Sequence, residues 1–192
     1  MAREVLEGGR VKGSVLRSHL LWAAEHQPPL KIQDICQHVS PESVRVLQAP
    51  ILTLGWYPFR TVIETDRAIS ALAGGVDLKE SVIALGRYSA RINLTTNYRV
   101  YNRSQPHEFF LSAAQLHSHF LDFGRAEYTR TGPGACRLSM RDYPCFSEVF
   151  CWSARGYYEQ ATLLQGGRNP KVIEATCMCR GDQSCDFEIR WS

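Results

Sequence analysis

The chain has 192 residues, of which 44% are hydrophobic and 21% charged, and its formal net charge is +3. These values are those of a globular protein and exclude a disordered chain. The mild charge argues against nucleic-acid binding, because the one basic stretch, residues 87–103, carries arginines of the kind that usually form the solvated face of a helix. No segment approaches the roughly 18 unbroken apolar residues of a membrane span, and no secretory signal is visible, so we expect a cytoplasmic protein.

Helices are predicted throughout the N-terminal half. Residues 1–10 are expected to be a flexible N-terminus, and residues 11–192 a single domain. Apolar residues recur at helical spacing from 11 to 26 and again from 58 to 72. Two further helix starts are predicted from their capping residues, Ser40 with Pro41 and Asp77 with Glu80.

The C-terminal half is predicted to alternate helices with strand hairpins. The apolar pattern indicates a helix from Pro106 to Phe123, with His117 inside its buried arc, and a longer helix from Tyr143 to Leu164. Two stretches are typical of strand pairs joined by glycine-containing turns, Glu127–Arg141 and Lys171–Trp191. This order predicts an α+β domain, in which N-terminal helices are followed by a helix-covered antiparallel sheet made of the two hairpins.

Three of the seven cysteines lie in the last hairpin, where strand alternation puts them on its apolar face. Ile173 and Ala175 are predicted to lie on the same face of the first strand as Cys177 and Cys179. Cys185 is predicted to lie on the apolar face of the return strand. Three roles stay open: small apolar side chains of the core, zinc ligands at Cys177 and Cys185, or a regulatory disulfide between those two. An odd number of cysteines favours a reducing compartment, in which thiols stay free.

Residues 156–191, GYYEQATLLQGGRNPKVIEATCMCRGDQSCDFEIRW, resemble the 4-vinyl-reductase domain family. That family ends in a helix and a Cys-x7-Cys hairpin with a turn glycine and a phenylalanine after the second cysteine. Here those positions are Cys177, Gly181, Cys185 and Phe187. The stretches VKGSVL and PILTLGWYPF are similar to an uncharacterised myxobacterial paralogous family related to haem-NO-binding domains. The resemblance extends from Val11 to Trp191.

The resemblance implies a bacterial regulatory protein with the helix-and-sheet fold also found in TRAPP vesicle-tethering subunits. It implies a hydrophobic small molecule, such as a porphyrin, an acyl chain or an aromatic, held between helices and sheet. The outcome in such proteins is signalling or assembly, not turnover. The resemblance also implies a metal at the paired cysteines, which have been proposed as ligands in the 4-vinyl-reductase family.

Haem is one specific form of this expectation. In haem-NO-binding domains a helical histidine is the axial ligand, and His117 in FFLSAAQLH lies at the matching place. Those domains hold the haem propionates with a Tyr-x-Ser-x-Arg motif. This chain has RLSMR, in which Ser139 and Arg141 match and Arg137 replaces the tyrosine. The replacement removes one hydrogen-bond donor and leaves two cationic groups that can pair with the carboxylates of an anionic ligand.

The sequence contains none of the common catalytic motifs, so we expect no enzyme. We expect a sensor that binds a hydrophobic or anionic small molecule and signals by protein contact, as a homodimer or with an unidentified regulatory protein. The alternatives are a dimeric TRAPP-like scaffold with a vestigial pocket and a haem-based gas sensor. The residues expected at the ligand are Trp56, Tyr57, Phe110, His117, Ser139, Arg141, Phe150 and Tyr157.

Overall fold

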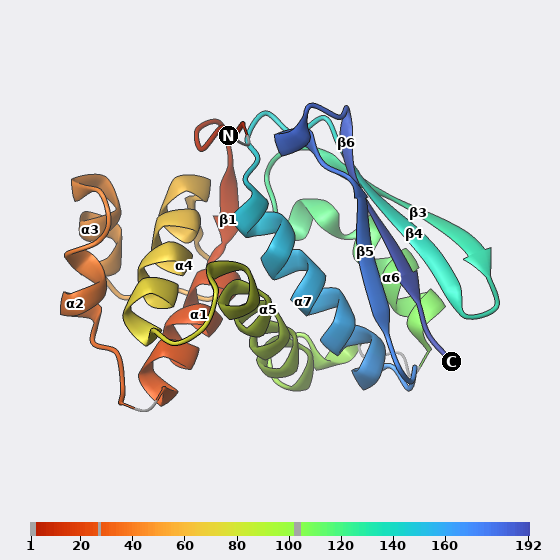
Figure 1. Ribbon diagram of the computed structural model, residues 1–192, viewed down its shortest axis with the longest axis horizontal. Coiled ribbons are helices and arrows are strands. Elements are labelled where there is room, and N and C mark those ends of the chain that lie inside the picture. The colour runs from red at the N-terminus through yellow and green to blue at the C-terminus, as the bar shows by residue number, and fades with distance from the viewer. Residues whose placement is uncertain (1–2, 27, 102–104) are drawn as a thin grey trace.

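The computed structural model describes residues 3–26, 28–101 and 105–192. A group of helices forms one side of the molecule, a sheet forms the other, and α7 lies between them (Figure 1). The helices are α1 Gly13–Glu25, α2 Ile32–Cys36, α3 Pro41–Leu47, α4 Phe59–Ala73, α5 Leu78–Thr95, α6 Pro106–Gln115 and α7 Glu148–Leu164, with the 3-10 turns η1 Arg99–Tyr101, η2 His117–His119 and η3 Met178–Arg180.

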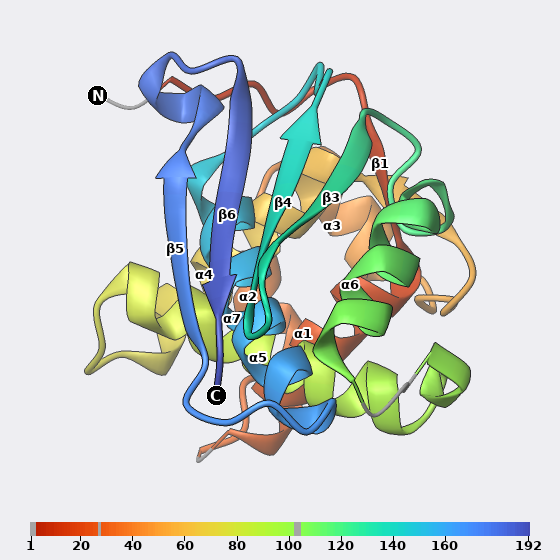
Figure 2. The same ribbon diagram turned by 90° about the vertical axis from the view of Figure 1, so that its right-hand side faces the viewer.

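The predicted α+β architecture is confirmed. The main sheet has four antiparallel strands in the order β3-β4-β6-β5, so the two predicted hairpins lie side by side with β4 against β6 (Figure 2). Its strands are β3 Arg125–Gly132, β4 Ala135–Arg141, β5 Lys171–Thr176 and β6 Ser184–Arg190. Helix α7 covers one face of this sheet, as the sequence pattern predicts.

A second, small sheet was not predicted. Strand β1, Arg10–Lys12, pairs with β2, Trp56–Pro58, in antiparallel register, with Val11 opposite Tyr57. Each strand has three residues, which is too short for an alternating pattern to be visible. The pair joins the start of α1 to the start of α4.

Several helix boundaries depend on local chemistry. The predicted starts at Ser40 and Asp77 are confirmed, since their side chains accept hydrogen bonds from the backbone N–H groups of Ser43 and Lys79. The long helix predicted from Tyr143 begins instead at Glu148, with Ser147 as its N-cap. Pro144 follows Tyr143 directly, and a residue before proline is disfavoured in helical conformation. The helix predicted from Pro106 to Phe123 ends at Gln115 and is followed by η2 and a non-helical segment.

The two faces of the sheet differ in polarity. On β4, Cys136 and Leu138 are 1% exposed and face the helices, whereas Arg137 between them is exposed. On β6, Cys185, Phe187 and Ile189 are buried as predicted. Alternation along each strand thus gives an apolar face toward α7 and a charged face toward solvent.

Strand β5 reverses the predicted faces. Val172 is buried and Ile173 is 56% exposed, so the prediction that Ile173 and Ala175 lie on the buried face is wrong. The register shifts between Glu174 and Thr176, where the strand has one residue more than its partner β6. Such a β-bulge changes which side the following residues face, and Cys177 therefore points inward and is fully buried.

Helices α5 and α7 approach each other closely through two glycines. A Cβ atom on Gly86 of α5 would overlap the carbonyl oxygen of Ser153, and one on Gly156 of α7 would overlap that of Ile83. Only glycine permits backbones to come this near. The crossing fixes α7 between α5 and the sheet.

The N-terminal segment, predicted to be flexible, is attached to the domain in its described part. Val5 and Phe146 exchange two backbone hydrogen bonds of 2.9 and 2.8 Å. Glu4 pairs with Arg67 at 2.7 Å. Residues 1–2 lie outside the described residues. Among the described helices, none is both long and apolar enough to cross a membrane.

Candidate functional site

A cavity of about 180 Å³ lies between the helices and the main sheet. Its walls come from α1, α5, α6, α7 and the inner face of the sheet. The apolar and aromatic side chains of the wall include Leu94, Phe109, Leu138, Met140, Phe150, Tyr157, Tyr158 and Phe187. None of the described residues lining it is Lys, Arg, Asp or Glu, so the cavity suits an uncharged occupant.

His117 lies in the wall of this cavity and is already hydrogen-bonded. Its Nε2 is 3.0 Å from the carbonyl oxygen of Phe123 and 3.3 Å from the hydroxyl of Tyr143. Burial lowers the pKa of His117, which favours the neutral ring. A neutral ring donates one proton, and a carbonyl oxygen can only accept, so we assign that proton to Nε2.

Three of the residues predicted at the ligand lie together in the cavity wall: His117, Phe150 and Tyr157. Phe110 is fully buried beside it, packed against Tyr158 and Trp191 at ring distances of 5.9 and 6.3 Å.

Trp56 and Tyr57 lie on β2 and do not reach the cavity. The ammonium of Lys12 is 4.1 Å from the centre of a Trp56 ring. The hydroxyl of Tyr57 accepts a hydrogen bond of 2.8 Å from the backbone of Leu52. Their positions follow from the small β1–β2 sheet, which the sequence pattern did not indicate.

The RLSMR segment points its polar side chains away from the cavity. Leu138 and Met140 line the cavity, so alternation puts Arg137, Ser139 and Arg141 on the opposite face. Arg137 pairs with Glu188 at 3.2 Å, and Arg141 pairs with Glu127 at 2.9 Å. Arg125 and Arg141 together hold the pKa of the Glu127 carboxyl below its usual range. Arg137 and Arg141 therefore belong to ion pairs on the outer face of the sheet. Ser139 alternates onto the same face but is only 6% exposed.

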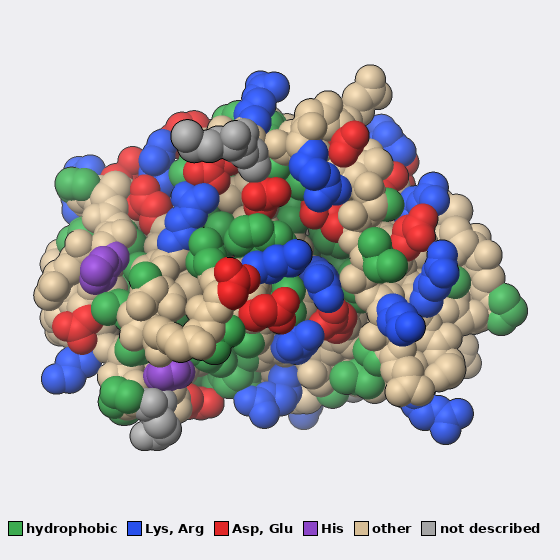
Figure 3. Space-filling view, viewed as in Figure 1, with side chains coloured by type: hydrophobic (Ala, Val, Ile, Leu, Met, Phe, Trp, Pro, Cys, Tyr) green, Lys and Arg blue, Asp and Glu red, His purple; other side chains and the backbone are tan. Residues whose placement is uncertain are grey.

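The basic stretch of residues 87–103 does not form a stripe of one sign. Arg87 pairs with Glu159 at 2.6 Å, and the guanidinium of Arg91 is 5.0 Å from the ring centre of Tyr88. Arg103 lies outside the described residues. On the face seen in Figure 3, cationic and acidic side chains are interspersed.

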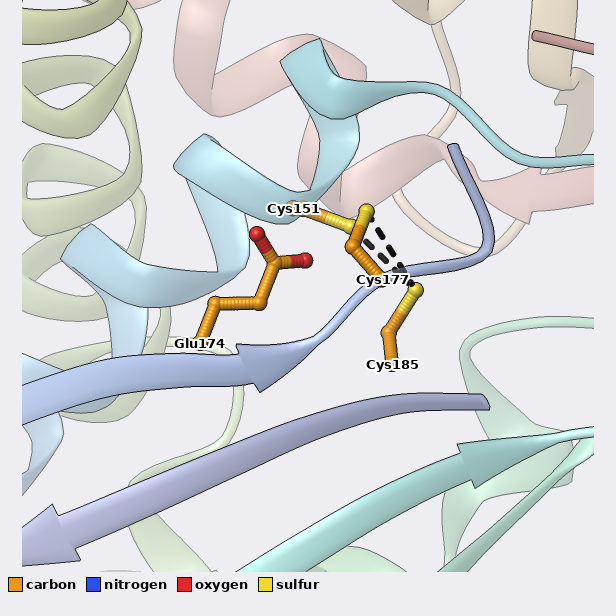
Figure 4. A group of neighbouring side chains, drawn as sticks. All are labelled: Cys151, Glu174, Cys177 and Cys185. Carbon is orange, nitrogen blue, oxygen red and sulfur yellow. Dashed lines mark hydrogen bonds between the residues drawn. The ribbon is translucent and has the colours of Figure 1, made fainter. Parts of the chain in front are cut away.

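A second site, the thiol cluster, consists of three thiols and one carboxyl group where α7 faces the last hairpin. Cys151 lies on α7, Glu174 on β5, Cys177 directly after β5, and Cys185 on β6. Each directs one ligand atom toward the others, and these four atoms all lie within 4.8 Å of one another (Figure 4). The sulfur of Cys185 is 3.6 Å from that of Cys151 and 4.0 Å from that of Cys177. A tetrahedral zinc site with Zn–S bonds of about 2.3 Å has S–S edges of about 3.8 Å. The geometry thus fits a four-ligand metal site.

The carboxyl group in this thiol cluster has one cationic partner on its outer side. Arg180 pairs with Oε2 of Glu174 at 3.3 Å, whereas Oε1 is buried with no hydrogen-bond partner among the described residues. The thiols of Cys151, Cys179 and Cys185 donate to the sulfur of Cys177 and hold its pKa well below the usual range. Burial raises the pKa of the Glu174 carboxyl to about 7. A buried thiolate beside a carboxyl group is unfavourable unless a cation lies between them, and a divalent metal ion would supply that charge.

The thiol cluster contains both cysteines predicted as metal ligands, together with two residues that were not predicted. Cys177 and Cys185 were expected from the sequence, but Cys179 does not belong to the set, and Cys151 and Glu174 complete it. Cys177 is turned inward by the bulge, and Gly181 closes the following turn with a φ of +97°, where a side chain would be strained. All seven cysteines lie in the described residues as free thiols. Cys151 and Cys185 also line the cavity, so the two sites share a wall.

No protein-family model matches the chain, and no curated protein matches it. Solved structures do match over nearly its whole length. The unliganded Fe(II) H-NOX protein from K. algicida has a TM-score of 0.69 at 10% identity, and the match covers 94% of this chain and 96% of that one. The H-NOX protein from S. oneidensis in the Fe(II)NO ligation state has a TM-score of 0.68 at 11% identity, covering 94% and 99%.

An oxygen-binding H-NOX domain related to soluble guanylate cyclases matches in the same way, with a TM-score of 0.65 at 11% identity, covering 94% and 95%. The predicted similarity to the haem-NO-binding fold is therefore confirmed at the level of the fold. The resemblance to 4-vinyl-reductase, TRAPP and myxobacterial proteins stays a prediction.

Proposed function

We propose that this chain is a sensor domain that binds one small, neutral, mainly apolar molecule in the cavity between its helices and its sheet. The observation that carries the proposal is the cavity, with a volume of about 180 Å³ and a lining free of charged side chains among the described residues. An engineered apolar cavity of about 150 Å³ in another protein binds benzene. The size therefore suits a molecule of about one ring.

The absence of cationic side chains from the described lining supports a neutral ligand over an anionic one. Bringing a carboxylate into an apolar site costs several kcal/mol unless a cation or several donors receive it. Arg137 and Arg141, the cationic groups expected to receive it, are paired on the other face of the sheet. The anionic form of the original expectation thus loses its support.

Haem, a group studied in the H-NOX family, fits the described cavity poorly. Its two propionates would meet no cationic side chain in the described wall, and the cavity is small for a porphyrin. The Nε2 atom of His117 is committed to the carbonyl oxygen of Phe123. We therefore keep haem as the alternative and assign no step of the function to it.

The bound ligand would act by shifting the populations of two conformations of the domain, not by undergoing a reaction. The ligand would touch elements from both layers at once, because the walls come from α1, α5, α6, α7 and the sheet. A shift of these elements changes the outer surface. We propose that the surface is read by protein contact, with a second copy of the chain or with a regulatory protein.

Thermal melting in the presence of toluene tests the cavity. We expect toluene to raise the Tm of the wild-type protein but not of Ala154→Phe, whose new ring fills the cavity. Ala71→Phe, at an exposed position of α4, is the control and should respond like the wild type. Ala113→Leu is a milder filling variant if Ala154→Phe does not fold.

The same samples separate the alternatives. No response of the wild-type protein to toluene, with a dimeric native mass, would favour the TRAPP-like scaffold. A Soret absorption band in freshly purified protein that is lost in His117→Ala would favour the haem-based sensor.

A separate observation favours a metal-binding role. We propose that Cys151, Glu174, Cys177 and Cys185 hold one zinc ion, because their ligand atoms lie within 4.8 Å of one another with near-tetrahedral sulfur spacing. A closed set of four protein ligands is typical of structural zinc, which would join α7 to the last hairpin.

Elemental analysis of the purified protein tests the zinc proposal. We expect about one zinc per chain, lost in Cys185→Ala and kept in Cys136→Ala, which removes another buried thiol outside the cluster. Metal-free wild-type protein that remains metal-free after incubation with zinc would leave the cysteines as core side chains.

A further inference from the structure

Polar side chains gather in one part of the cavity wall, where α1 meets α5. Ser14, Ser89 and Asn93 line the cavity and are each at most 3% exposed. Ser18 completes the group, with its hydroxyl oxygen 2.7 Å from that of Ser89. We call these four residues the serine–asparagine cluster. A buried polar group is costly unless it is hydrogen-bonded, so the use of each proton and lone pair determines what the cluster can bind.

The side-chain protons of Ser18, Ser89 and Asn93 are committed within the protein, and the hydroxyl oxygen of Ser14 accepts a hydrogen bond of 3.2 Å from the hydroxyl of Tyr98. The hydroxyl of Ser18 donates to the carbonyl oxygen of Val15 at 2.8 Å. A hydroxyl has one proton, so the contact between Ser18 and Ser89 uses the proton of Ser89. Asn93 Nδ2 directs its two protons to the carbonyl oxygen of Ser14 at 3.4 Å and the hydroxyl of Ser89 at 3.2 Å.

Lone pairs are left over in the same cluster. The hydroxyl oxygen of Ser89 has two lone pairs and accepts one hydrogen bond, from Asn93. The side-chain oxygen of Asn93 accepts one long hydrogen bond, from Nδ2 of Asn97 at 3.5 Å. An amide oxygen has two lone pairs, so one of them remains unused. This part of the wall therefore offers acceptors that the described residues leave largely unused.

We infer that the serine–asparagine cluster is an acceptor subsite, which selects ligands whose apolar body carries one neutral hydrogen-bond donor, a hydroxyl or an amino group. The inference rests on the proposed function of the cavity. A ligand donor takes the spare lone pairs of Asn93 and Ser89. An anion is repelled by the same lone pairs, and a cation finds no carboxylate among the described lining residues.

Three probes of similar ring size separate these cases: benzyl alcohol carries a neutral donor, toluene carries none, and benzoate carries a negative charge. Their Kd values are measured by calorimetry on the full chain. Ser89→Ala and Asn93→Leu remove the acceptors. Ser112→Ala is the matched control, because Ser112 also lines the cavity but belongs to α6, outside the cluster.

We expect Ser89→Ala and Asn93→Leu to weaken benzyl alcohol by roughly five- to tenfold, the loss of about one net hydrogen bond. Toluene should not be weakened by either variant, Ser112→Ala should change neither probe, and benzoate should not bind.

Two outcomes overturn the inference in different ways. If benzyl alcohol and toluene both bind but respond alike to Ser89→Ala and Asn93→Leu, the subsite is refuted and the proposed function stands. If neither probe binds the wild-type protein, the proposed function fails and the subsite with it. Ser89→Ala, which removes a single oxygen atom, carries the test if Asn93→Leu does not fold.

Discussion

A buried pair between α1 and α4 allows a quantitative test of how the helical side is held together. His19 Nδ1 lies 2.7 Å from the carboxylate of Asp66, and the two side chains are 0% and 1% exposed. The other ring nitrogen of His19 and the other oxygen of Asp66 have no hydrogen-bond partner within the described part of the chain. The free-energy cost of removing both groups from water is therefore offset by a single hydrogen bond, the one between His19 and Asp66.

Removing one partner leaves the other buried and uncompensated. Asp66→Ala is expected to lower the free energy of unfolding by about 3–5 kcal/mol, the usual cost of breaking a buried pair. His19→Leu should cost a similar amount. Replacing both, with His19→Leu and Asp66→Leu together, should cost far less than the sum, because no unpaired polar atom of either side chain remains.

Urea unfolding followed by circular dichroism measures the three variants against the wild type. We expect a coupling energy of roughly 2 kcal/mol or more between the two positions. Additive effects, or an Asp66→Ala cost below about 1 kcal/mol, would refute the argument that the pair is desolvated and mutually dependent.

Three further predictions concern a close helix contact, a helix cap and a buried histidine. Gly156→Ala should lower the free energy of unfolding in urea by about 1–3 kcal/mol, because the added methyl group overlaps the carbonyl oxygen of Ile83. Gly132→Ala is the control and should lower it much less, because a Cβ atom there meets its nearest neighbour at 3.6 Å. Ser147→Ala should cost about 1 kcal/mol through loss of the α7 N-cap; an unchanged urea midpoint would contradict this role. Burial lowers the folded-state pKa of His117, so below about pH 6.5 the unfolded chain binds a proton that the folded chain does not. The free energy of unfolding should therefore decrease as the pH is lowered, by at most about 1.4 kcal/mol per pH unit. His117→Phe should flatten this slope between pH 7 and 5, and equal slopes for the two proteins would contradict the assignment.

The fold could be predicted from the sequence where elements are long and their patterns local. The α5 start at Asp77 and the two C-terminal hairpins follow from capping residues and strand alternation. Helix α2 and the β1–β2 sheet were missed because elements of three to five residues show no period. Their formation depends on pairing and packing with distant segments.

The cavity residues were predicted unevenly for a related reason. The helical pattern put Phe150 and Tyr157 on the inner face of α7, and they line the cavity. On β4, the resemblance to a propionate-binding motif favoured an inward Arg141, although the apolar residues Leu138 and Met140 alternate with it. Because Leu138 and Met140 face the apolar core, the residues that alternate with them, including Arg141, face the other side of the strand.

The thiol cluster could be predicted only in part. Cys177 and Cys185 were visible as a pair, but Cys151 is contributed by a separate helix and Glu174 by a strand position that looked solvent-facing. The register shift that brings Glu174 and Cys177 to one side depends on the pairing of β5 with β6, which single-strand periodicity does not contain.

The bulge in β5 also gives the four residues of the thiol cluster an unusual spacing in the sequence. In a regular strand, a carboxylate and a thiol two positions apart share a face, whereas here two residues separate Glu174 from Cys177 and the extra one is taken up by the bulge. With Cys151 before them and Cys185 after them, the chain reads Cys-x22-Glu-x2-Cys-x7-Cys. Such a string of intervals can be searched for in other chains that share too little overall similarity to be aligned, and it selects those able to build the same cluster.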